Sequence, residues 1–249
     1  MGEETETAGR VRGRIEAILD YAGVRGWRQG ENPARWRGYL EKLLPKKTKV
    51  RAVAHHPALP FAELPAFVRR LRQEGGMAAR ALEFAILTAA RTGEVIGAQW
   101  NEIDRDAKLW TIPGERMKGR REHRVPLSEA ALALLDALGQ QRIGEFVFVG
   151  GKTGRPLSNM AMLVLLRRMK RADLTVHGFR STFRDWAAER TSFQNEVIEM
   201  ALAHAIGDKV EAAYRRGDLF EKRMRLIEAW AGYCQSTPAA GAVVPLRRA

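Results

Sequence analysis

Six side chains with the chemistry of phosphoryl transfer follow one another along this sequence. In chain order they are Arg91, Lys118, His177, Arg180, His204 and Tyr214. A planar guanidinium can bind two oxygens of one phosphodiester, and a lysine can protonate a leaving oxygen. A phenol has an ordinary pKa of about 10, so it attacks phosphorus at neutral pH only with help from nearby cations or a base. The set predicts transfer of a phosphodiester to Tyr214, and no step of that transfer needs a metal or another cofactor.

Members of this set also have structural interpretations when each is taken alone. Arg91 could be the last cation of a buried helix, facing the helix dipole, with Gly93 as the stop signal. Lys118 could lie in a solvated basic turn that contacts a DNA backbone. Tyr214 could pack its ring on a helix with its hydroxyl at the surface. The joint occurrence favours the catalytic interpretation, in which Glu94 is placed to orient Arg91.

The composition agrees with a nucleic-acid partner and excludes several other classes of protein. The 249 residues include 42 Lys and Arg against 29 Asp and Glu, a formal net charge of +13. This excess favours a polyanion, with nucleic acid ahead of an anionic membrane surface. No run of about 18 apolar residues predicts a membrane span. One cysteine, Cys234, can form no internal disulfide, so we expect a cytoplasmic protein. Zinc, P-loop and serine-hydrolase motifs do not occur.

Helices are predicted to position most of these residues. Apolar residues at helical spacing predict helices over 11–22, 33–44, 60–73, 77–92, 128–138 and 158–171, and a broken helical region over 178–235. Residues 108–112 and 123–127 are predicted strands on either side of a basic turn, and 145–149 a short strand. The sequence therefore predicts a mainly helical α+β fold with a small antiparallel sheet.

A basic stretch interrupted by proline predicts the division of the chain. Residues 1–50 are expected to form a small helical piece, whose first nine residues fray, and residues 51–57 a linker. Residues 58–235 are expected to form the larger domain, and residues 236–249 a mobile tail without periodicity. The six chemical residues all fall in the larger domain.

Four stretches make the sequence similar to the tyrosine recombinase, or phage integrase, family, in particular to integrases of prophages and genomic islands. They are AARTGEVIGAQWNEID, LWTIPGERMKGRREHRVPLS, TVHGFRSTFRDWAAE and ALAHAIGDKVEAAYRRGDLFEKR. The resemblance implies the integrase catalytic fold for the larger domain. It also implies a site-specific recombinase of a mobile genetic element that cuts and rejoins DNA without metal or ATP.

The resemblance implies roles for the residues that bind and break the phosphodiester. Arg91 and Arg180 would bind the scissile phosphate. Lys118 would act as general acid on the 5′-hydroxyl leaving group. Tyr214 would attack to give a 3′-phosphotyrosyl intermediate.

Supporting roles follow from the same resemblance. His177 would contact the phosphate and assist proton transfer, His204 would hydrogen-bond a phosphate oxygen, and Glu94 would support the site. Basic residues of the linker and the turn are expected to contact the DNA backbone: Lys46, Lys47, Lys49, Arg51, Arg116, Arg120 and Arg121.

The partner implied is double-stranded DNA, with a homotetramer assembled on it, DNA-bending accessory proteins as further partners, and no membrane. The protein would be cytoplasmic and encoded by a bacterium or a phage. Residues 1–50 resemble the C-terminal part of a core-binding domain, so a natural truncation, a fragment or an engineered version is expected. Two alternatives stay open. One is a truncated integrase fragment that binds DNA without full recombination, and the other is a type IB topoisomerase-like relaxing enzyme.

Overall fold

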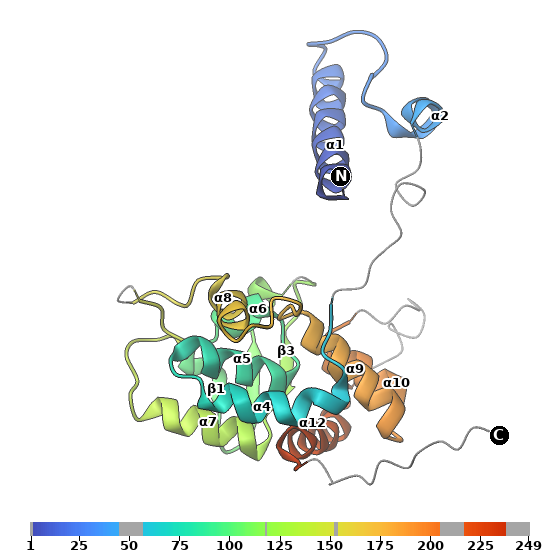
Figure 1. Cartoon of the computed structure of the whole chain (residues 1–249). Coiled ribbons are helices and arrows are strands. Elements are labelled where there is room, and N and C mark those ends of the chain that lie inside the picture. Colours follow the sequence, from blue (N-terminus) through green and yellow to red (C-terminus); the bar gives the residue numbers. More distant parts are fainter. Residues whose placement is uncertain (1, 45–56, 118, 152–153, 205–216, 238–249) are drawn as a thin grey trace, which may run out of the picture. The chain divides into compact units, whose positions relative to one another are not determined.

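The computed structural model describes residues 2–44, 57–117, 119–151, 154–204 and 217–237. The chain divides into two compact units, residues 1–55 and 56–249 (Figure 1). The predicted linker falls almost wholly outside the described residues, as does most of the predicted tail. The domain bounds given by the sequence therefore remain a prediction.

The N-terminal unit consists of one long helix and a short irregular helical segment. Helix α1 spans Gly2–Val24, so the expected fraying of the first nine residues is wrong from Gly2 onward. The helix predicted over 33–44 is also wrong, because only the π-helical turn Trp36–Leu40 and α2, Glu41–Leu43, are helical. Gly38 interrupts the turn Trp36–Leu40 with a φ of 76°, a conformation that glycine adopts at little cost.

The larger unit is built around α5, Met77–Thr88, whose residues from Ala81 to Thr88 are all buried. The other long helices of the described unit pack against it (Figure 1): α4 (Leu64–Gln73), α7 (Glu129–Gly139), α8 (Ala161–Arg168), α9 (Gly178–Arg190) and α12 (Phe220–Gln235). The helices predicted over 60–73, 128–138 and 158–171 are confirmed, with shifts of a few residues at their ends.

A three-stranded antiparallel sheet covers one side of this helical core. Its order is β1 (Ile103–Asp104), β2 (Leu109–Ile112) and β3 (His123–Pro126), with Trp110 opposite Val125. The two predicted hairpin strands are confirmed, and the two-residue strand β1 was not predicted. The strand expected over 145–149 is wrong, because this segment makes only two isolated bridges. The mainly helical fold with a small antiparallel sheet is confirmed.

Helix α12 is fixed to the core by aromatic packing. The indole of Trp230 donates a hydrogen bond of 2.7 Å to the Ile86 carbonyl of α5. The rings of Phe183 and Trp186 from α9 lie 5.2 and 4.9 Å from the Trp230 ring, measured between centroids. This helix therefore packs within its own unit, and its first residues are held close to the sheet.

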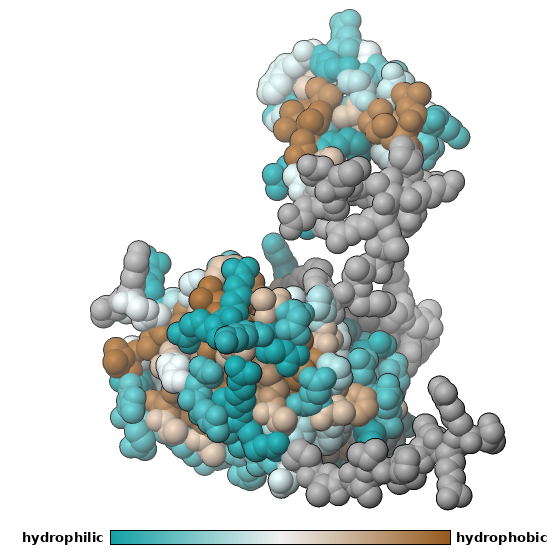
Figure 2. Space-filling model, in the orientation of Figure 1, coloured by the Kyte–Doolittle hydropathy of each residue, from teal (hydrophilic) through white to brown (hydrophobic). Residues whose placement is uncertain are grey.

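Apolar side chains are distributed differently in the N-terminal unit. Ile18, Trp27 and Leu43 are among several large apolar residues exposed there, and apolar patches are visible on its surface (Figure 2). Over the described ranges of the whole chain, no helix combines the length and apolar character needed to cross a membrane.

Candidate active site

A sharp change of direction after the buried helix places Arg91. Helix α5 ends at Thr88, and Ala89 takes the left-handed conformation with a φ of 50°. Arg91 then becomes the N-cap residue of α6, Thr92–Ile96. The structural interpretation of Arg91 as the final cation of the buried helix is therefore wrong. Gly93 lies inside α6 and stops no helix.

Glu94 fixes both the backbone and the guanidinium of Arg91. One carboxylate oxygen accepts from the Arg91 backbone N–H at 2.7 Å, and the other accepts from Arg91 Nη1 at 2.7 Å. Glu94 is only 5% exposed. Hydrogen bonds between charged groups are about twice as strong as neutral ones, so Glu94 holds Arg91 in one orientation.

Arg116 also contacts helix α6. Its Nη2 donates to the Glu94 carbonyl at 2.6 Å, and its Nη1 pairs with the Glu102 carboxylate. The sequence suggested a DNA contact for Arg116, and the structure gives its guanidinium these internal partners. Arg120 and Arg121, from the same turn, are exposed.

Arg180 is a buried guanidinium beside Arg91. It lies in the first turn of α9 and is 5% exposed. Its Nη1 donates to the Ala89 carbonyl and its Nη2 to the Leu202 carbonyl. Burial and the neighbouring Arg91 lower the pKa of Arg180 to about 10, so it stays cationic at pH 7. Its buried Nε has no hydrogen-bond partner among the described residues.

The last turn after α10, Asn195–Ala201, brings the two arginines together. Arg91 Nη2 donates to the Ala203 carbonyl at 3.1 Å and lies 3.4 Å from the Leu202 carbonyl oxygen, which also accepts from Arg180. Two positive charges therefore converge on one backbone oxygen.

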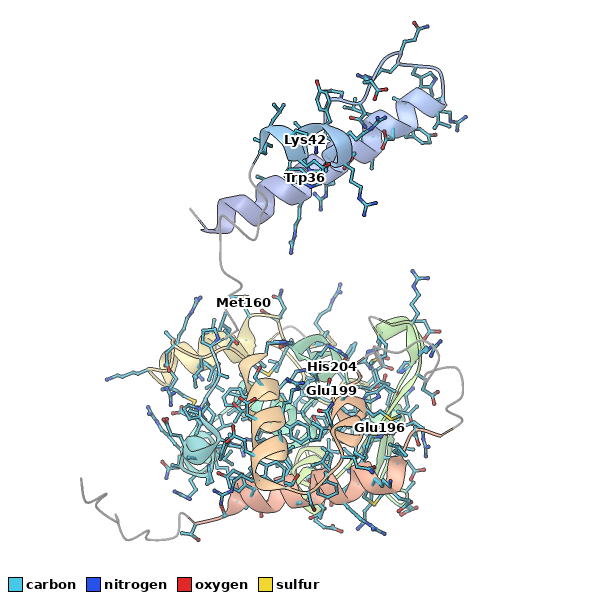
Figure 3. The ribbon with its side chains drawn as sticks, turned by 90° about the vertical axis from the view of Figure 1, so that its right-hand side faces the viewer. Trp36, Lys42, Met160, Glu196, Glu199 and His204 are labelled. Atoms are coloured by element: carbon cyan, nitrogen blue, oxygen red, sulfur yellow. The ribbon has the colours of Figure 1, made fainter. Side chains whose placement is uncertain are left out.

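His204 completes this group and is oriented by Glu199 (Figure 3). His204 Nε2 lies 3.3 Å from Arg180 Nη2, and His204 Nδ1 lies 2.6 Å from a Glu199 oxygen. The other Glu199 oxygen accepts from Arg184 Nε at 2.7 Å. Burial alone raises the pKa of Glu199, but the hydrogen bonds from His204 and Arg184 outweigh it and lower the pKa below its ordinary value. The Glu199 carboxylate is thus an acceptor, which assigns a proton to His204 Nδ1.

His177 occupies the N-cap position of α9, three residues before Arg180, and is exposed. The next residue, Gly178, is approached closely by the chain that enters the unit. A Cβ atom at Gly178 would lie 2.1 Å from the Pro57 carbonyl oxygen. Glycine at this position therefore lets the first turn of α9, with His177 and Arg180, pack directly against residues 57–59.

His123 is a further histidine near the arginines, and sequence reasoning did not single it out. It begins β3, opposite Ile112. Burial lowers the pKa of His123 to about 4, with further lowering from Arg223, Arg91 and Arg180 against the opposing charge of Glu94. The ring is therefore neutral at pH 7. Its position beside a predicted lysine-bearing turn is the one signal in the sequence that could have drawn attention to it.

Two of the six predicted residues, Lys118 and Tyr214, lie outside the described residues. The predicted DNA contacts Lys46, Lys47, Lys49 and Arg51 do so as well. The structure brings together Arg91, Arg180 and His204 with the supporting Glu94. Within the described ranges, no group of three or more His, Cys, Asp or Glu side chains could hold a metal ion.

Comparison with known proteins decides the family. Residues 59–219 match the phage integrase family, and residues 2–39 match the phage integrase central domain. The chain belongs to the phage integrase family. The resemblance noted from its motifs is therefore confirmed.

Curated members of the phage integrase family align over most of this chain. It is 32% identical to prophage integrase IntA of Escherichia coli K12 over 244 residues, which cover 96% of the chain and 57% of the relative. It is 31% identical to the integrase of Enterobacteria phage P4 over 248 residues, covering 92% of the chain and 55% of the relative. The chain thus spans little more than half the length of these integrases.

Solved integrases share its fold. A lambda integrase tetramer bound to a Holliday junction superposes with a TM-score of 0.60 at 15% identity, over 83% of this chain and 60% of that one. The integrase of mycobacterium phage Brujita superposes with a TM-score of 0.54 at 17% identity, over 97% and 75%. The integrase fold implied by the sequence is therefore confirmed.

Proposed function

We propose that this phage integrase is a site-specific recombinase that cuts and rejoins DNA through a 3′-phosphotyrosyl link to Tyr214. The observation that carries the proposal is the convergence of Arg91 and Arg180 on the Leu202 carbonyl, with His204 in contact with Arg180. Two guanidiniums held this close favour an anionic ligand such as a phosphodiester, whose negative charge increases in the transition state. Arg91, which is more exposed than the buried Arg180, gives such a ligand access to this charge.

The reaction follows from the chemistry of these groups. The Tyr214 oxygen attacks phosphorus and passes its proton to His177 or to a water molecule, while the bond from phosphorus to the 5′ oxygen breaks. Lys118 supplies a proton to that leaving oxygen. Arg91 and Arg180 hold the non-bridging oxygens, whose charge increases in the transition state. Rejoining reverses these steps with the 5′-hydroxyl of another strand, so the phosphoester energy is conserved.

Two histidines and two acidic residues support this transfer. His177, exposed at the start of α9, contacts the phosphate and assists proton transfer. His204 donates to a phosphate oxygen through Nε2 as an imidazolium, with Nδ1–H held by Glu199. Glu94 keeps the Arg91 guanidinium in place through its two hydrogen bonds.

Duplex DNA is the partner in this proposal. Lys46, Lys47, Lys49, Arg51, Arg120 and Arg121 contact its backbone. A homotetramer forms on it, in line with the lambda integrase tetramer that shares the fold, and DNA-bending proteins assist. Residues 1–50 act as part of a core-binding domain joined through 51–57 to a catalytic domain of residues 58–235, with 236–249 as a tail. The reaction takes place in the cytoplasm of a bacterial host.

A nicked duplex made from the flanks of the chain's own gene tests the proposal. The nick lets the short 5′ piece diffuse away after cleavage, so the covalent protein–DNA complex accumulates and is seen on a denaturing gel. We expect the complex with the unchanged chain and with Tyr233→Phe, whose hydroxyl bonds to the Phe61 carbonyl in the core. We expect none with Tyr214→Phe.

Each alternative has its own outcome in the same assay. Tight binding of the duplex with no covalent complex would indicate a fragment that binds without cleaving. Relaxation of any supercoiled plasmid, whatever its sequence, would indicate a topoisomerase-like enzyme. Either result would contradict the proposed recombinase.

A further inference from the structure

Arg223 of α12 is a fully buried arginine outside the group around Leu202. It is 2% exposed, and each of its three guanidinium nitrogens has an acceptor. Its Nε donates to the Asp218 carbonyl at 2.7 Å, and its Nη2 donates to the Asp218 carboxylate at 2.7 Å. Its Nη1 donates to the Arg124 carbonyl of strand β3. One side chain thus joins the start of α12 to the sheet.

Arg124 and Phe220 complete what we call the Asp218 cluster, which consists of Asp218, Phe220, Arg223 and Arg124. Arg124 Nη1 donates to the same Asp218 oxygen at 3.1 Å, and the Phe220 backbone N–H donates to the other oxygen at 3.2 Å. The guanidinium carbons of Arg124 and Arg223 lie 4.5 and 5.8 Å from the Phe220 ring centroid. One carboxylate therefore accepts from two arginines and a backbone amide.

A buried guanidinium is costly unless it is fully paired. Burial lowers the pKa of Arg223, and Asp218 opposes that shift. Asp218 itself is more open, because its side chain is 38% exposed and that of Arg124 is 42% exposed. Ion pairs this exposed contribute little to global stability. The exposed Arg124–Asp218 pair is therefore suited to fixing a local geometry, and the buried Arg223 adds to the stability of the α12–β3 junction.

The position of the cluster in the sequence indicates which geometry it fixes. Asp218 follows Tyr214 by four residues, and Arg124 follows Lys118 by six. The contacts thus join Asp218, just after the proposed nucleophile, to Arg124, just after the proposed general acid.

We propose that the Asp218 cluster is a positioning device that anchors the segment bearing Tyr214 onto β3, so that the phenol reaches the phosphate held by Arg91 and Arg180. The inference rests on the proposed function of Tyr214. Asp218 touches no reacting atom in this scheme and acts through the segment it holds. A misplacement of about 1 Å in a reacting group can cost about 100-fold in rate.

Asp218→Asn tests the anchor, because the amide keeps the size of the side chain but removes its charge. Asp173→Asn is the matched control, since Asp173 pairs with Arg171 on the surface at 3.0 Å. We expect Asp218→Asn to lower the rate of covalent complex formation at saturating nicked duplex by about 10-fold or more. Its Kd for the duplex should stay close to that of the control. Both rates are measured well below the melting temperature of each variant, because loss of the charge beside the buried Arg223 lowers stability. An unchanged rate would overturn the proposal, as would a defect confined to Kd or melting.

A duplex with sulfur in place of the bridging 5′ oxygen separates the role of the general acid Lys118 from the positioning role of Asp218. A thiolate leaves without a proton, so this duplex should restore cleavage by Lys118→Ala. Because Asp218 positions the nucleophile, we expect Asp218→Asn to keep its defect on this duplex. Full recovery of Asp218→Asn on the sulfur duplex would contradict the proposed role.

Limited proteolysis tests the anchor even if no covalent complex forms, because it does not depend on DNA cleavage. Trypsin cleaves after Arg215 and Arg216, which directly follow Tyr214. The initial rate of cleavage there, followed by mass spectrometry of the full chain, should rise several-fold in Asp218→Asn and stay unchanged in Asp173→Asn. Equal rates in the two variants would refute the anchor, whereas failure of the proposed function alone would leave the difference intact.

Discussion

Replacing Glu199 by glutamine keeps the size of the side chain and removes the charge that orients His204 and pairs with Arg184. The two Glu199 oxygens accept from His204 Nδ1 at 2.6 Å and from Arg184 Nε at 2.7 Å. A glutamine side chain has one oxygen and one amide nitrogen, so it can accept from only one of these donors. If its nitrogen faces the ring, the His204 proton must move to Nε2, which faces the donor Nη2 of Arg180.

The contacts set the size of the effect. A hydrogen bond to a charged group contributes about 1.5–3 kcal/mol. The His204 side chain is 40% exposed, so solvent screens it and the lower value of about 1.5 kcal/mol applies. Because about 1.4 kcal/mol corresponds to a factor of ten, the cleavage rate should fall about 10-fold. If the His204 proton also moves from Nδ1 to Nε2, the rate should fall further.

The assay measures the rate of covalent complex formation at saturating nicked duplex, with Kd for the same duplex measured separately. Glu199→Gln should lower the rate and leave Kd within about twofold, because His204 acts in the transfer step. Glu199→Asp, which keeps the charge, should recover part of the rate. Glu189→Gln on the exposed face of α9 is the matched control. A rate equal to that of the control would refute the role assigned to Glu199.

Three further predictions follow from the described contacts. Gly178→Ala should destabilise the chain by about 1–3 kcal/mol in urea unfolding, since its Cβ would lie 2.1 Å from the Pro57 carbonyl oxygen. Gly232→Ala on α12, where a Cβ meets nothing within 4 Å, should stabilise the chain by up to about 1 kcal/mol. Changes in stability of the same sign for both variants would contradict the close approach at Gly178. His123 has a pKa lowered to about 4, so the unfolded chain binds the proton first as the pH falls below about 6.5. The unchanged chain should therefore lose up to about 3 kcal/mol more stability than His123→Gln between about pH 6.5 and 4, and equal losses would contradict the lowered pKa of His123. Arg180→Lys, which loses the forked donors, should cleave about 100- to 1,000-fold more slowly at saturating duplex, and a near-normal rate would exclude Arg180 from the transition state.

The sequence singled out Arg91, Arg180 and His204, which the structure brings together, but not the local path of the chain around them. Arg91 was placed at a helix end because Ala89 and Ala90 continue the apolar pattern of α5. Ala89 instead takes a left-handed conformation, which costs an L-residue about 1–2 kcal/mol. Its carbonyl accepts from Arg180, which lies far along the chain. Only tertiary contacts of this kind could have shown where α5 ends.

Glu199 and the Asp218 cluster escaped prediction for a related reason. In the sequence, Glu199 is one acidic residue on a short helix, and its partner Arg184 comes from α9. Arg223 looks like an ordinary basic residue at the start of an amphipathic helix. Its burial depends on the pairing of α12 with β3. Periodicity and spacing report contacts within an element, and these groups form between elements.

The most direct test of the account is to identify the residue that becomes linked to DNA. After reaction with the nicked duplex, nuclease and protease digestion followed by tandem mass spectrometry would locate the nucleotide on a single side chain. The account predicts a 3′-phosphate on Tyr214, with nothing on Tyr21, Tyr39 or Tyr233, which are the other tyrosines of the chain. A link to any other residue, or an unaltered yield from Tyr214→Phe, would contradict it.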